Sequence, residues 1–195
     1  MSRRRFYATP EEIAGSRIHL SIEESHHLLR VLRLQIGEEV YVFDGCGQEY
    51  RCAIVAAEGK CARLEILDAL SDTIESPLRL TLAQALAKGE KFDFIVQKAT
   101  ELGVSAIAPL VTDYTDVKLQ AESAAKRLER WRRISLEALK QCGRRRAVEI
   151  SEPQTLRQFL AAPPPGAMLV FSEKGGVGIT KALAEITDTS SITAV

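Results

Sequence analysis

The stretch that decides the fold spans residues 88–104 and reads KGEKFDFIVQKATELGV. Its apolar residues recur at the spacing of one helical face, and Gly103 stands where a helix is expected to stop, so a helix is predicted. Short apolar runs of strand length flank it at residues 78–86 and 104–110, which makes a β-α-β unit. Loops after the strands of such units face the ligand crevice, and Lys88 and Gly89 lie in that loop. The predicted buried face of the helix consists of Phe92, Ile95, Val96, Ala99 and Leu102.

The chain beyond residue 77 continues as alternating strands and helices. This alternation predicts an α/β fold with a mostly parallel sheet that helices cover on both faces. The longest helix is expected at residues 121–142, with Gly143 as its cap. Its predicted buried stripe is Ala124, Leu128, Trp131, Ala138 and Cys142, and its predicted polar side is Lys126, Arg130, Arg133, Glu137 and Lys140. Further strands are expected at 147–150, 167–171 (buried) and 192–195, and further helices at 153–161 and 180–186.

Residues 1–70 are predicted to form a separate, β-rich domain. Short alternating segments with turn residues at close intervals are typical of a small barrel, and Asp44-Gly45 indicates a hairpin between two of its strands. Ser21 with Glu24 fits a capping box at the start of a short helix that carries His26 and His27. The polar, aperiodic segment 71–77 is the expected linker to an α/β domain at 78–195.

The composition narrows the class of protein. With 195 residues and 46% hydrophobic content, the chain can bury a sizeable core. Its 26 basic and 26 acidic residues leave no net charge, so a polyanionic partner would have to be bound by local basic patches. No apolar run has the length of a signal core or a membrane span, and the cysteines and histidines lack the spacing of zinc ligands. We therefore expect a soluble, cytoplasmic protein with free thiols, no membrane partner and no metal.

Two groups of arginines suggest contact with RNA. Arg30 and Arg33, three residues apart, lie on one side of a turn, and residues 144–146 are three arginines after the end of the long helix, beside the expected crevice. Arginine can clamp phosphate and stack on bases, so a two-domain grip on RNA is one interpretation. The alternative is that the arginines merely pair with nearby carboxylates on a solvated surface. The candidate partners of Arg30 and Arg33 are Glu23, Glu24 and Glu38.

The glycine-rich loop at residues 173–178, EKGGVG, follows a predicted strand and opens a predicted helix. Backbone amides at such a position can bind a nucleotide. The loop lacks both the Lys-Ser/Thr ending of a P-loop and the third glycine of a dinucleotide fingerprint, so an ordinary strand-to-helix turn stays equally open. The sequence also has no motif of a zinc metalloprotease or serine hydrolase and no clustered carboxylate pair of a glycosidase.

Several short motifs, in their order and spacing, resemble one family along nearly the whole chain. They are Arg5-Phe6-Tyr7, His27-Leu28-Leu29-Arg30-Val31-Leu32-Arg33 with Gly37, Phe43-Asp44-Gly45, Lys88-Gly89-Glu90-Lys91, Gln97-Lys98-Ala99-Thr100-Glu101-Leu102-Gly103-Val104, and Glu137-Ala138 with Gln141-Cys142-Gly143-Arg144. With them the chain resembles the RsmE family, bacterial small-subunit ribosomal RNA uridine N3-methyltransferases of the SPOUT superfamily.

The resemblance implies a fold, a reaction and partners. The implied fold is a small N-terminal β-barrel of PUA or OB type, joined to a SPOUT-type α/β methyltransferase domain with a C-terminal trefoil knot, a rare exception to unthreaded topology. The implied protein is a homodimer that uses S-adenosylmethionine to methylate N3 of a uridine in ribosomal RNA, free or in the assembled small subunit. Because the sulfonium is an activated methyl donor, the protein has to orient the uracil and help to remove its N3 proton.

The resemblance, combined with the basic pattern, also suggests site residues. Glu101 has a competing interpretation as the structural partner of Lys98. The expected catalytic residues are Arg144, Glu101 and Lys91; the expected cofactor-binding residues are Phe171, Ser172, Glu173, Lys174 and Gly175; and the expected RNA-binding residues are Arg3, Arg4, Arg5, Arg30, Arg33, Lys88 and Arg145.

The chain departs from the family pattern in two places. Family members continue past residue 195 into a glycine-rich loop and a further segment that build the knot and most of the cofactor pocket, so the knot is expected to be absent or incomplete and this chain alone inactive. Residues 112–115, Thr-Asp-Tyr-Thr, replace a frequent Ser-Glu-Arg-Ser, which places an expected arginine contact in doubt. Two other classes stay open: an RNA-binding protein without catalysis, and a different α/β enzyme that binds a nucleotide phosphate at the Gly176 loop.

Overall fold

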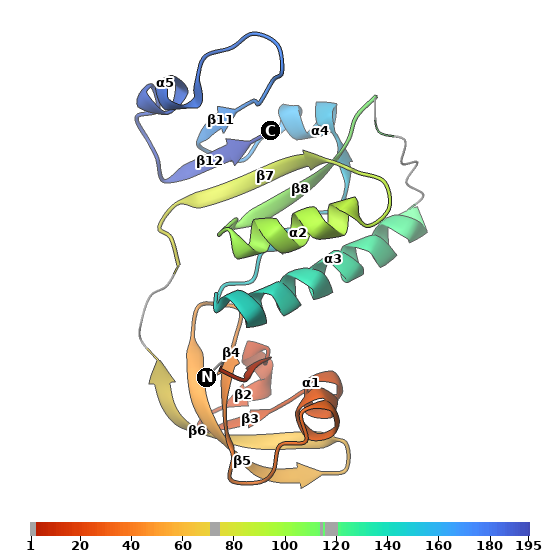
Figure 1. The fold of residues 1–195 in the computed structure, drawn as a ribbon, viewed down its shortest axis with the longest axis vertical. Helices are drawn as coiled ribbons and strands as arrows, with labels where there is room; N and C mark the ends of the chain where they lie inside the picture. The colour runs from red at the N-terminus through yellow and green to blue at the C-terminus, as the bar shows by residue number, and fades with distance from the viewer. Residues whose placement is uncertain (1–2, 71–74, 114, 116–120) are drawn as a thin grey trace. The chain divides into compact units, whose positions relative to one another are not determined.

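The computed structural model describes residues 3–70, 75–113, 115 and 121–195, which form two compact units (Figure 1). Unit 1 comprises Met1–Glu75 with Leu139–Ala147, and unit 2 comprises Ser76–Ala138 with Val148–Val195. The sequence places the boundary at residues 71–77, of which 71–74 lie outside the described residues. The return of Leu139–Ala147 to unit 1 is not anticipated by the sequence, because no local pattern marks it.

Unit 1 is built on a six-stranded curled sheet, which confirms the predicted β-rich first domain. The strand order is β1-β4-β5-β6-β3-β2, and the β1–β4 pair is parallel while the other pairs are antiparallel. Its elements are β1 (Arg5–Tyr7), η1 (Pro10–Glu12), β2 (Ile13–Ala14), β3 (Arg17–His19), α1 (Ile22–His26), the π-helical turn η2 (His27–Val31), β4 (Glu39–Phe43), β5 (Glu49–Glu58) and β6 (Cys61–Leu70). The alternation of the strands places Val40, Val42, Cys52, Ile54 and Leu64 in one core with Phe6, Ile18 and Leu28.

Two local predictions for unit 1 can be compared with the structure. The Asp44 carboxylate accepts hydrogen bonds from the backbone N–H groups of Cys46, Gly47 and Gln48 at 2.7, 3.1 and 3.0 Å, and this turn joins the antiparallel pair β4–β5 as predicted. The capping box is only half present. Ser21 accepts from the Glu24 backbone N–H, but the Glu24 carboxylate accepts from the Tyr7 N–H and pairs with Lys140.

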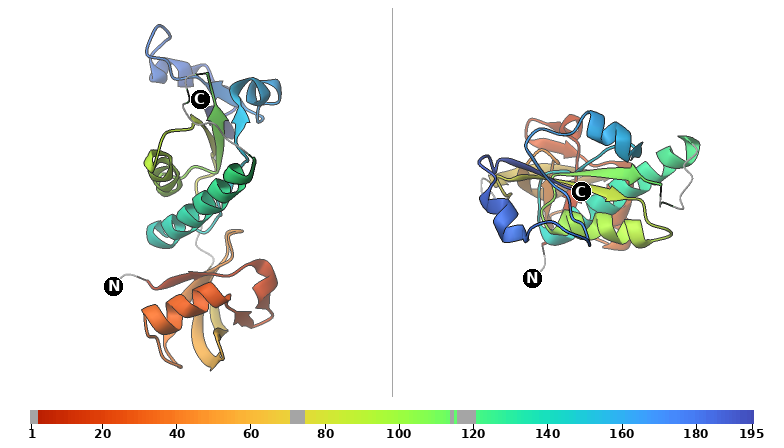
Figure 2. Two further views of the ribbon diagram at one scale, coloured as in Figure 1. Left: turned by 90° about the vertical axis from the view of Figure 1, so that its right-hand side faces the viewer. Right: turned by 90° about the horizontal axis from the view of Figure 1, so that it is seen from above.

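Unit 2 contains a wholly parallel sheet in the order β10-β8-β7-β12-β11, with β9 paired to β8. Leu82 of β7 packs in the core on the side of α2 and α3, and the next residue, Ala83, packs on the side of α4. The left view of Figure 2 shows α2 and α4 on opposite faces of this sheet, which confirms the predicted α/β architecture. The strands are β7 (Arg79–Ala85), β8 (Ala106–Val111), β9 (Glu149–Ile150), β10 (Gln154–Thr155), β11 (Ala167–Leu169) and β12 (Ser191–Ala194); the helices are α2 (Lys91–Glu101), α3 (Ala121–Cys142), α4 (Leu156–Ala161) and α5 (Ile179–Ala184).

Helix α2 forms where the opening stretch predicts it, but its buried face is shifted. Phe92, Val96 and Ala99 are buried, and the Phe92 ring lies 4.6 Å from the Trp131 ring of α3. Leu102 is 83% exposed, so its predicted burial is wrong. The helix has already ended there, and Thr100 takes the buried position instead, with its hydroxyl 3.0 Å from that of Ser135 on α3.

The buried stripe of α3 is correct for most of its length and wrong at its end. Leu128, Trp131 and Ala138 are buried as predicted, whereas Cys142 is exposed and Lys140 is only 7% exposed. The reason is that residues from Leu139 onward pack within unit 1, where the Lys140 ammonium pairs with the buried Glu24 carboxylate. A stripe extrapolated from a single helical period cannot account for a helix whose last turn joins another core.

The last elements are shorter and less buried than the sequence predicts. Strand β11 is half-buried rather than buried, and it ends at Leu169. Helix α4 begins only at Leu156, because Thr155 caps it in a full capping box with Gln158. Among the described residues, no helix combines the length and apolarity needed to cross a membrane.

Candidate functional site

A crevice of about 400 Å³ lies at the carboxyl ends of the parallel strands of unit 2. Ligands of open α/β sheets bind at this edge, because side chains and loops converge there while the strands themselves are covered. The volume and the mostly apolar lining with a few polar groups are those of a site for a small organic molecule. The lining residues are Leu82, Ala83, Gln84, Ala85, Leu110, Thr112, Leu156, Phe171, Ala194 and Val195.

The order of the strands brings these segments together from distant parts of the sequence. Strand β7 is at the centre of the sheet, with β8 on one side and β12 on the other. Beyond β12, Val195 donates its N–H to the Leu169 carbonyl, and Phe171 donates its N–H to the Val195 carbonyl, each at 2.8 Å. These bonds hold Phe171 at the rim of the crevice, where 62% of its surface is exposed.

The predicted cofactor loop begins at this rim. Phe171 lines the crevice, and Ser172, Glu173, Lys174 and Gly175 follow it on the surface. The Ser172 hydroxyl accepts from the Lys174 N–H at 3.2 Å and donates to the Lys174 carbonyl at 3.0 Å, so this side chain shapes the loop. Helix α5 after the loop has only six residues, too short for its amino end to serve as a strong anion site.

Sequence reasoning missed the two polar residues of the crevice wall, Gln84 and Thr112. Gln84 donates from Nε2 to the Ala85 carbonyl at 3.2 Å, and the Thr112 N–H donates to the Thr115 hydroxyl at 2.8 Å. Both lie at the carboxyl end of a parallel strand or directly after it. The rule that ligands bind at this edge could have selected them. Tyr114, in the segment that departs from the family pattern, lies outside the described residues.

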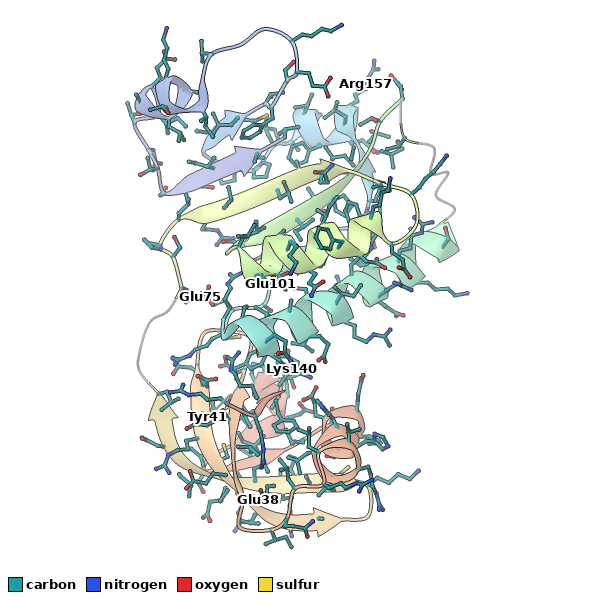
Figure 3. The ribbon with its side chains drawn as sticks, in the orientation of Figure 1. Glu38, Tyr41, Glu75, Glu101, Lys140 and Arg157 are labelled. Atoms are coloured by element: carbon teal, nitrogen blue, oxygen red, sulfur yellow. The ribbon has the colours of Figure 1, made fainter. Side chains whose placement is uncertain are left out.

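Two of the predicted catalytic residues lie on α2, at opposite ends of the helix. The Lys98 ammonium donates to the Glu101 carboxylate at 2.7 Å, which confirms the alternative that Glu101 has Lys98 as a structural partner. Lys91 is exposed at the first residue of the helix. It has no ion-pair partner within the part of the chain that the structure describes. Figure 3 labels Glu101 on this helix.

The third predicted catalytic residue, Arg144, belongs to unit 1 and is nearly buried. Its guanidinium binds the Glu75 carboxylate through Nε and Nη2, each at 3.0 Å. Burial raises the pKa of Glu75, but the backbone N–H groups of Arg146 and Arg145 and the Arg144 guanidinium outweigh it, so the pKa lies below its ordinary value of 4.5. Glu75, at the end of the first segment of unit 1, therefore holds the segment after α3 in place through these hydrogen bonds and the ion pair.

Acid is expected to weaken this interaction. Because the pKa of Glu75 is lower in the folded unit, its stabilising contribution is present above the ordinary pKa and is lost as the pH falls through the folded value. The protection of β5 and β6 amides against hydrogen exchange, which reports on unit 1 alone, should therefore decline with acid less steeply in Glu75→Gln than in the wild type. Identical pH profiles would contradict the assignment.

Two of the predicted RNA-binding residues are not available to RNA. Arg5 is 8% exposed and Arg145 is 4% exposed, and both guanidinium groups bind the buried Glu49 carboxylate, at 2.6 and 3.2 Å. Arg5 also donates to the backbone carbonyls of Leu139 and Arg144, and Arg145 donates to that of Leu70. The prediction of RNA contacts for Arg5 and Arg145 is therefore corrected, because both guanidinium groups are buried and bind acceptors inside unit 1.

The other predicted RNA-binding residues are accessible. Arg3 is half-exposed, with its guanidinium 4.7 Å from the centre of the Tyr41 ring, and Arg4 pairs with Glu38 at 2.8 Å. Arg30 and Arg33 are exposed, as is Lys88 in the loop after β7. Lys88 belongs to unit 2 and the four arginines to unit 1.

In the described ranges, no three His, Cys, Asp or Glu side chains form a group that could hold a metal ion. The four cysteines, Cys46, Cys52, Cys61 and Cys142, are free thiols in the structure.

Comparison with known proteins agrees with this architecture. The sequence model of the family described as "RNA methyltransferase domain" matches residues 74–195, and the one described as "RNA methyltransferase PUA domain" matches residues 21–67. The first match covers more than half of the chain. The chain belongs to the RNA methyltransferase family.

Within this RNA methyltransferase family, the resemblance to RsmE is confirmed. The ribosomal RNA small subunit methyltransferase E of Synechocystis sp. is 38% identical over 168 residues, which are 85% of this chain and 54% of that protein. The chain thus spans about half the length of this relative.

Solved structures of methyltransferases share the fold closely. Lpg2936 of Legionella pneumophila, described as a methyltransferase in complex with the bound cofactor SAM, superposes with a TM-score of 0.90 at 30% identity and covers 100% of this chain and 79% of its own. The ribosomal RNA small subunit methyltransferase E of Neisseria gonorrhoeae, bound to S-adenosyl methionine, superposes with a TM-score of 0.85 at 31% identity, with 98% and 79% covered.

Proposed function

We propose that this protein is part of a homodimeric enzyme that uses S-adenosylmethionine to methylate N3 of a uridine in small-subunit ribosomal RNA. The observation that carries the proposal is the crevice at the carboxyl ends of β7, β8 and β12, in a chain whose fold matches methyltransferases with bound cofactor at 30% and 31% identity. The names of the relatives, ribosomal RNA small subunit methyltransferases, support ribosomal RNA as the substrate. The choice of the uridine N3 and of a homodimer rests on what the resemblance to the RsmE family implies.

The residues of the crevice fit S-adenosylmethionine. Its apolar walls, from Leu82, Leu110 and Leu156, suit the faces of an adenine ring, and Phe171 at the rim offers an aromatic surface for stacking. Gln84 and Thr112 offer amide and hydroxyl groups for the polar edge of a nucleoside. When bound, this cofactor supplies an activated methyl group on a sulfonium, so no group of the protein has to activate the donor.

The residues of this chain would then bind and orient the RNA. Lys91, at the amino end of α2 and after the loop that leaves the central strand, is the one predicted catalytic residue of unit 2 without an ion-pair partner among the described residues. We assign it to a phosphate or to the uracil carbonyl oxygens that gain negative charge as N3 loses its proton. Glu101 and Arg144 are bound to Lys98 and Glu75, so we assign them to positioning rather than to contact with the base.

Calorimetry with three ligands tests the proposal against its alternatives. S-adenosylmethionine should bind the complete protein with one site per chain, and ATP and NAD should not compete. Binding of ATP or NAD alone would favour a different nucleotide-binding enzyme. Binding of ribosomal RNA without any binding of S-adenosylmethionine would favour an RNA-binding protein that lacks catalysis. Sedimentation equilibrium of the same sample should give the mass of a dimer.

Substitution of Lys91 tests its assignment. In the complete protein, Lys91→Ala should lower kcat/KM for methyl transfer to small-subunit ribosomal RNA by roughly tenfold, the equivalent of about 1.4 kcal/mol of transition-state stabilisation. The affinity for S-adenosylmethionine should stay within about twofold of the wild type, because Lys91 does not line the crevice. Lys60→Ala, which removes another exposed lysine, from the turn between β5 and β6, is the matched control. Equal losses in both variants would contradict a specific role.

A further inference from the structure

The segment that follows α1 combines three unusual features in one short stretch of unit 1. Helix α1 continues into the π-helical turn η2, in which the Leu32 N–H donates to the His27 carbonyl at 2.9 Å. Directly after it, Arg33 has a φ of 55°, and it is the one non-glycine residue with positive φ among those the structure describes. Single π-helical turns and strained backbone of this kind gather at functional sites.

Arginine is an unexpected residue at this position. A left-handed conformation strains an L-residue with a Cβ, whereas glycine would adopt it without strain. The turn needs such a residue, because the Leu34 N–H folds back to the Leu28 carbonyl at 3.1 Å and both leucines are buried in the core. The backbone therefore explains the conformation but not the arginine. What the arginine adds is its side chain, which is exposed.

Two of the three nearby carboxylates are already paired with other cations. Glu24 is buried against Lys140, and Glu38 binds Arg4. Of the three glutamates that could pair with Arg30 and Arg33, Glu23 alone has no such partner among the residues that the structure describes. Within the described ranges, no carboxylate pairs with Arg30 or Arg33. The alternative interpretation, that these two arginines merely form ion pairs with nearby glutamates, therefore does not hold for the described residues.

Exposed apolar residues stand next to Arg30 and Arg33 in the sequence. Val31, Leu32 and Ile36 are 59%, 41% and 65% exposed. Soluble proteins do expose single apolar residues, but here three lie within six positions of the chain. The same stretch carries two guanidinium groups that have no carboxylate partner among the described residues. Guanidinium groups bind phosphate bidentately, and apolar side chains pack against unstacked bases and riboses.

We propose that the turn from Arg30 to Ile36 binds a single-stranded segment of the substrate RNA, with Arg30 and Arg33 on its phosphates and with Val31, Leu32 and Ile36 against an unstacked nucleotide. This inference rests on the proposed function, because it assumes an RNA substrate. It adds to that function the turn of unit 1 that would bind the RNA. Leu28 and Leu34 anchor both ends of the turn in the core, so its shape is fixed before the RNA arrives.

Arg33→Gly separates RNA binding from folding. Glycine relaxes the backbone at φ 55°, so the midpoint of thermal unfolding should stay equal to that of the wild type or rise. The affinity for labelled small-subunit ribosomal RNA, measured with the 195-residue chain by fluorescence anisotropy, should nevertheless fall by about tenfold. The slope of log affinity against log salt concentration should become less negative by about 1, as expected for one lost phosphate contact.

The control is Arg17→Ala, which removes the same charge from an exposed position on β3. It should change the RNA affinity by less than about twofold. The inference is overturned if Arg33→Gly keeps the affinity and salt slope of the wild type, or if Arg17→Ala lowers them as much. Either result would leave the proposed function standing if the wild type still binds RNA and the complete protein still binds S-adenosylmethionine. A complete protein that binds neither ligand would instead remove both proposals.

Discussion

Replacement of Glu49 by alanine is expected to lower the free energy of unfolding of unit 1 by about 3–5 kcal/mol, the range for breaking a buried ion pair from one side. Glu49 is 2% exposed, and its carboxylate is shared by the buried guanidinium groups of Arg5 and Arg145. Without it, two positive charges would stay in a core that excludes water. A loss of this size is a large part of the total stability of a small domain.

Hydrogen exchange of the β4, β5 and β6 amides measures the loss in unit 1 alone. The matched control is Glu39→Ala, because Glu39 pairs with Arg51 at 3.0 Å on the surface, where the two side chains are 52% and 37% exposed. Exposed pairs contribute about 0–1 kcal/mol, so protection in this variant should hardly change. Comparable losses of protection in the two variants would show that the buried ion pairs of Glu49 contribute no more to stability than an exposed pair does.

The same network explains why the run of arginines after α3 has a different role from the one that its sequence suggests. Three consecutive arginines look like an RNA-binding surface, because a sequence shows charges but not their partners. Arg145 instead binds Glu49, and Arg144 binds Glu75, across 96 and 69 positions of the chain (145 − 49 and 144 − 75). Only the folded chain brings such distant residues together, and burial then changes their role from binding to stability.

Local patterns predicted the elements well where one core decides the burial of a whole segment. Helix α2 and the flanking strands β7 and β8 all lie in unit 2, and periodicity located each of them. Helix α3 shows where this fails. Its period correctly selected Leu128 and Trp131, but its last turn enters unit 1, so Lys140 is buried and Cys142 is exposed.

The sequence predicts at which edge of the sheet the candidate site lies, but it does not predict the full set of residues that line it. The β-α-β unit alone indicates that ligands bind after the strands. It does not indicate that β12, near residue 195, lies directly beside β7, and that Ala194 and Val195 therefore share a crevice with Ala85. The order of strands in a sheet depends on contacts between distant segments, which no window of sequence contains.

A bulky residue at the carboxyl end of the central strand is expected to abolish cofactor binding. Ala85 is the last residue of β7, lines the crevice and is half-buried, so the indole of Ala85→Trp would occupy the space we assign to S-adenosylmethionine. At a ligand concentration of about 100 times Kd, the wild-type protein gains about 2.7 kcal/mol of stability from binding, and the variant should gain none. Thermal unfolding with and without S-adenosylmethionine measures this gain.

Arg79→Trp provides the matched control for the indole. Arg79 is at the opposite end of the same strand, and its side chain is 68% exposed, so an indole there adds the same bulk away from the crevice. This variant should keep the full stabilisation by S-adenosylmethionine. If Ala85→Trp is folded and still stabilised, the cofactor binds elsewhere in the protein. If both variants lose the stabilisation, the crevice cannot be the cause, because only one of the two substitutions fills it.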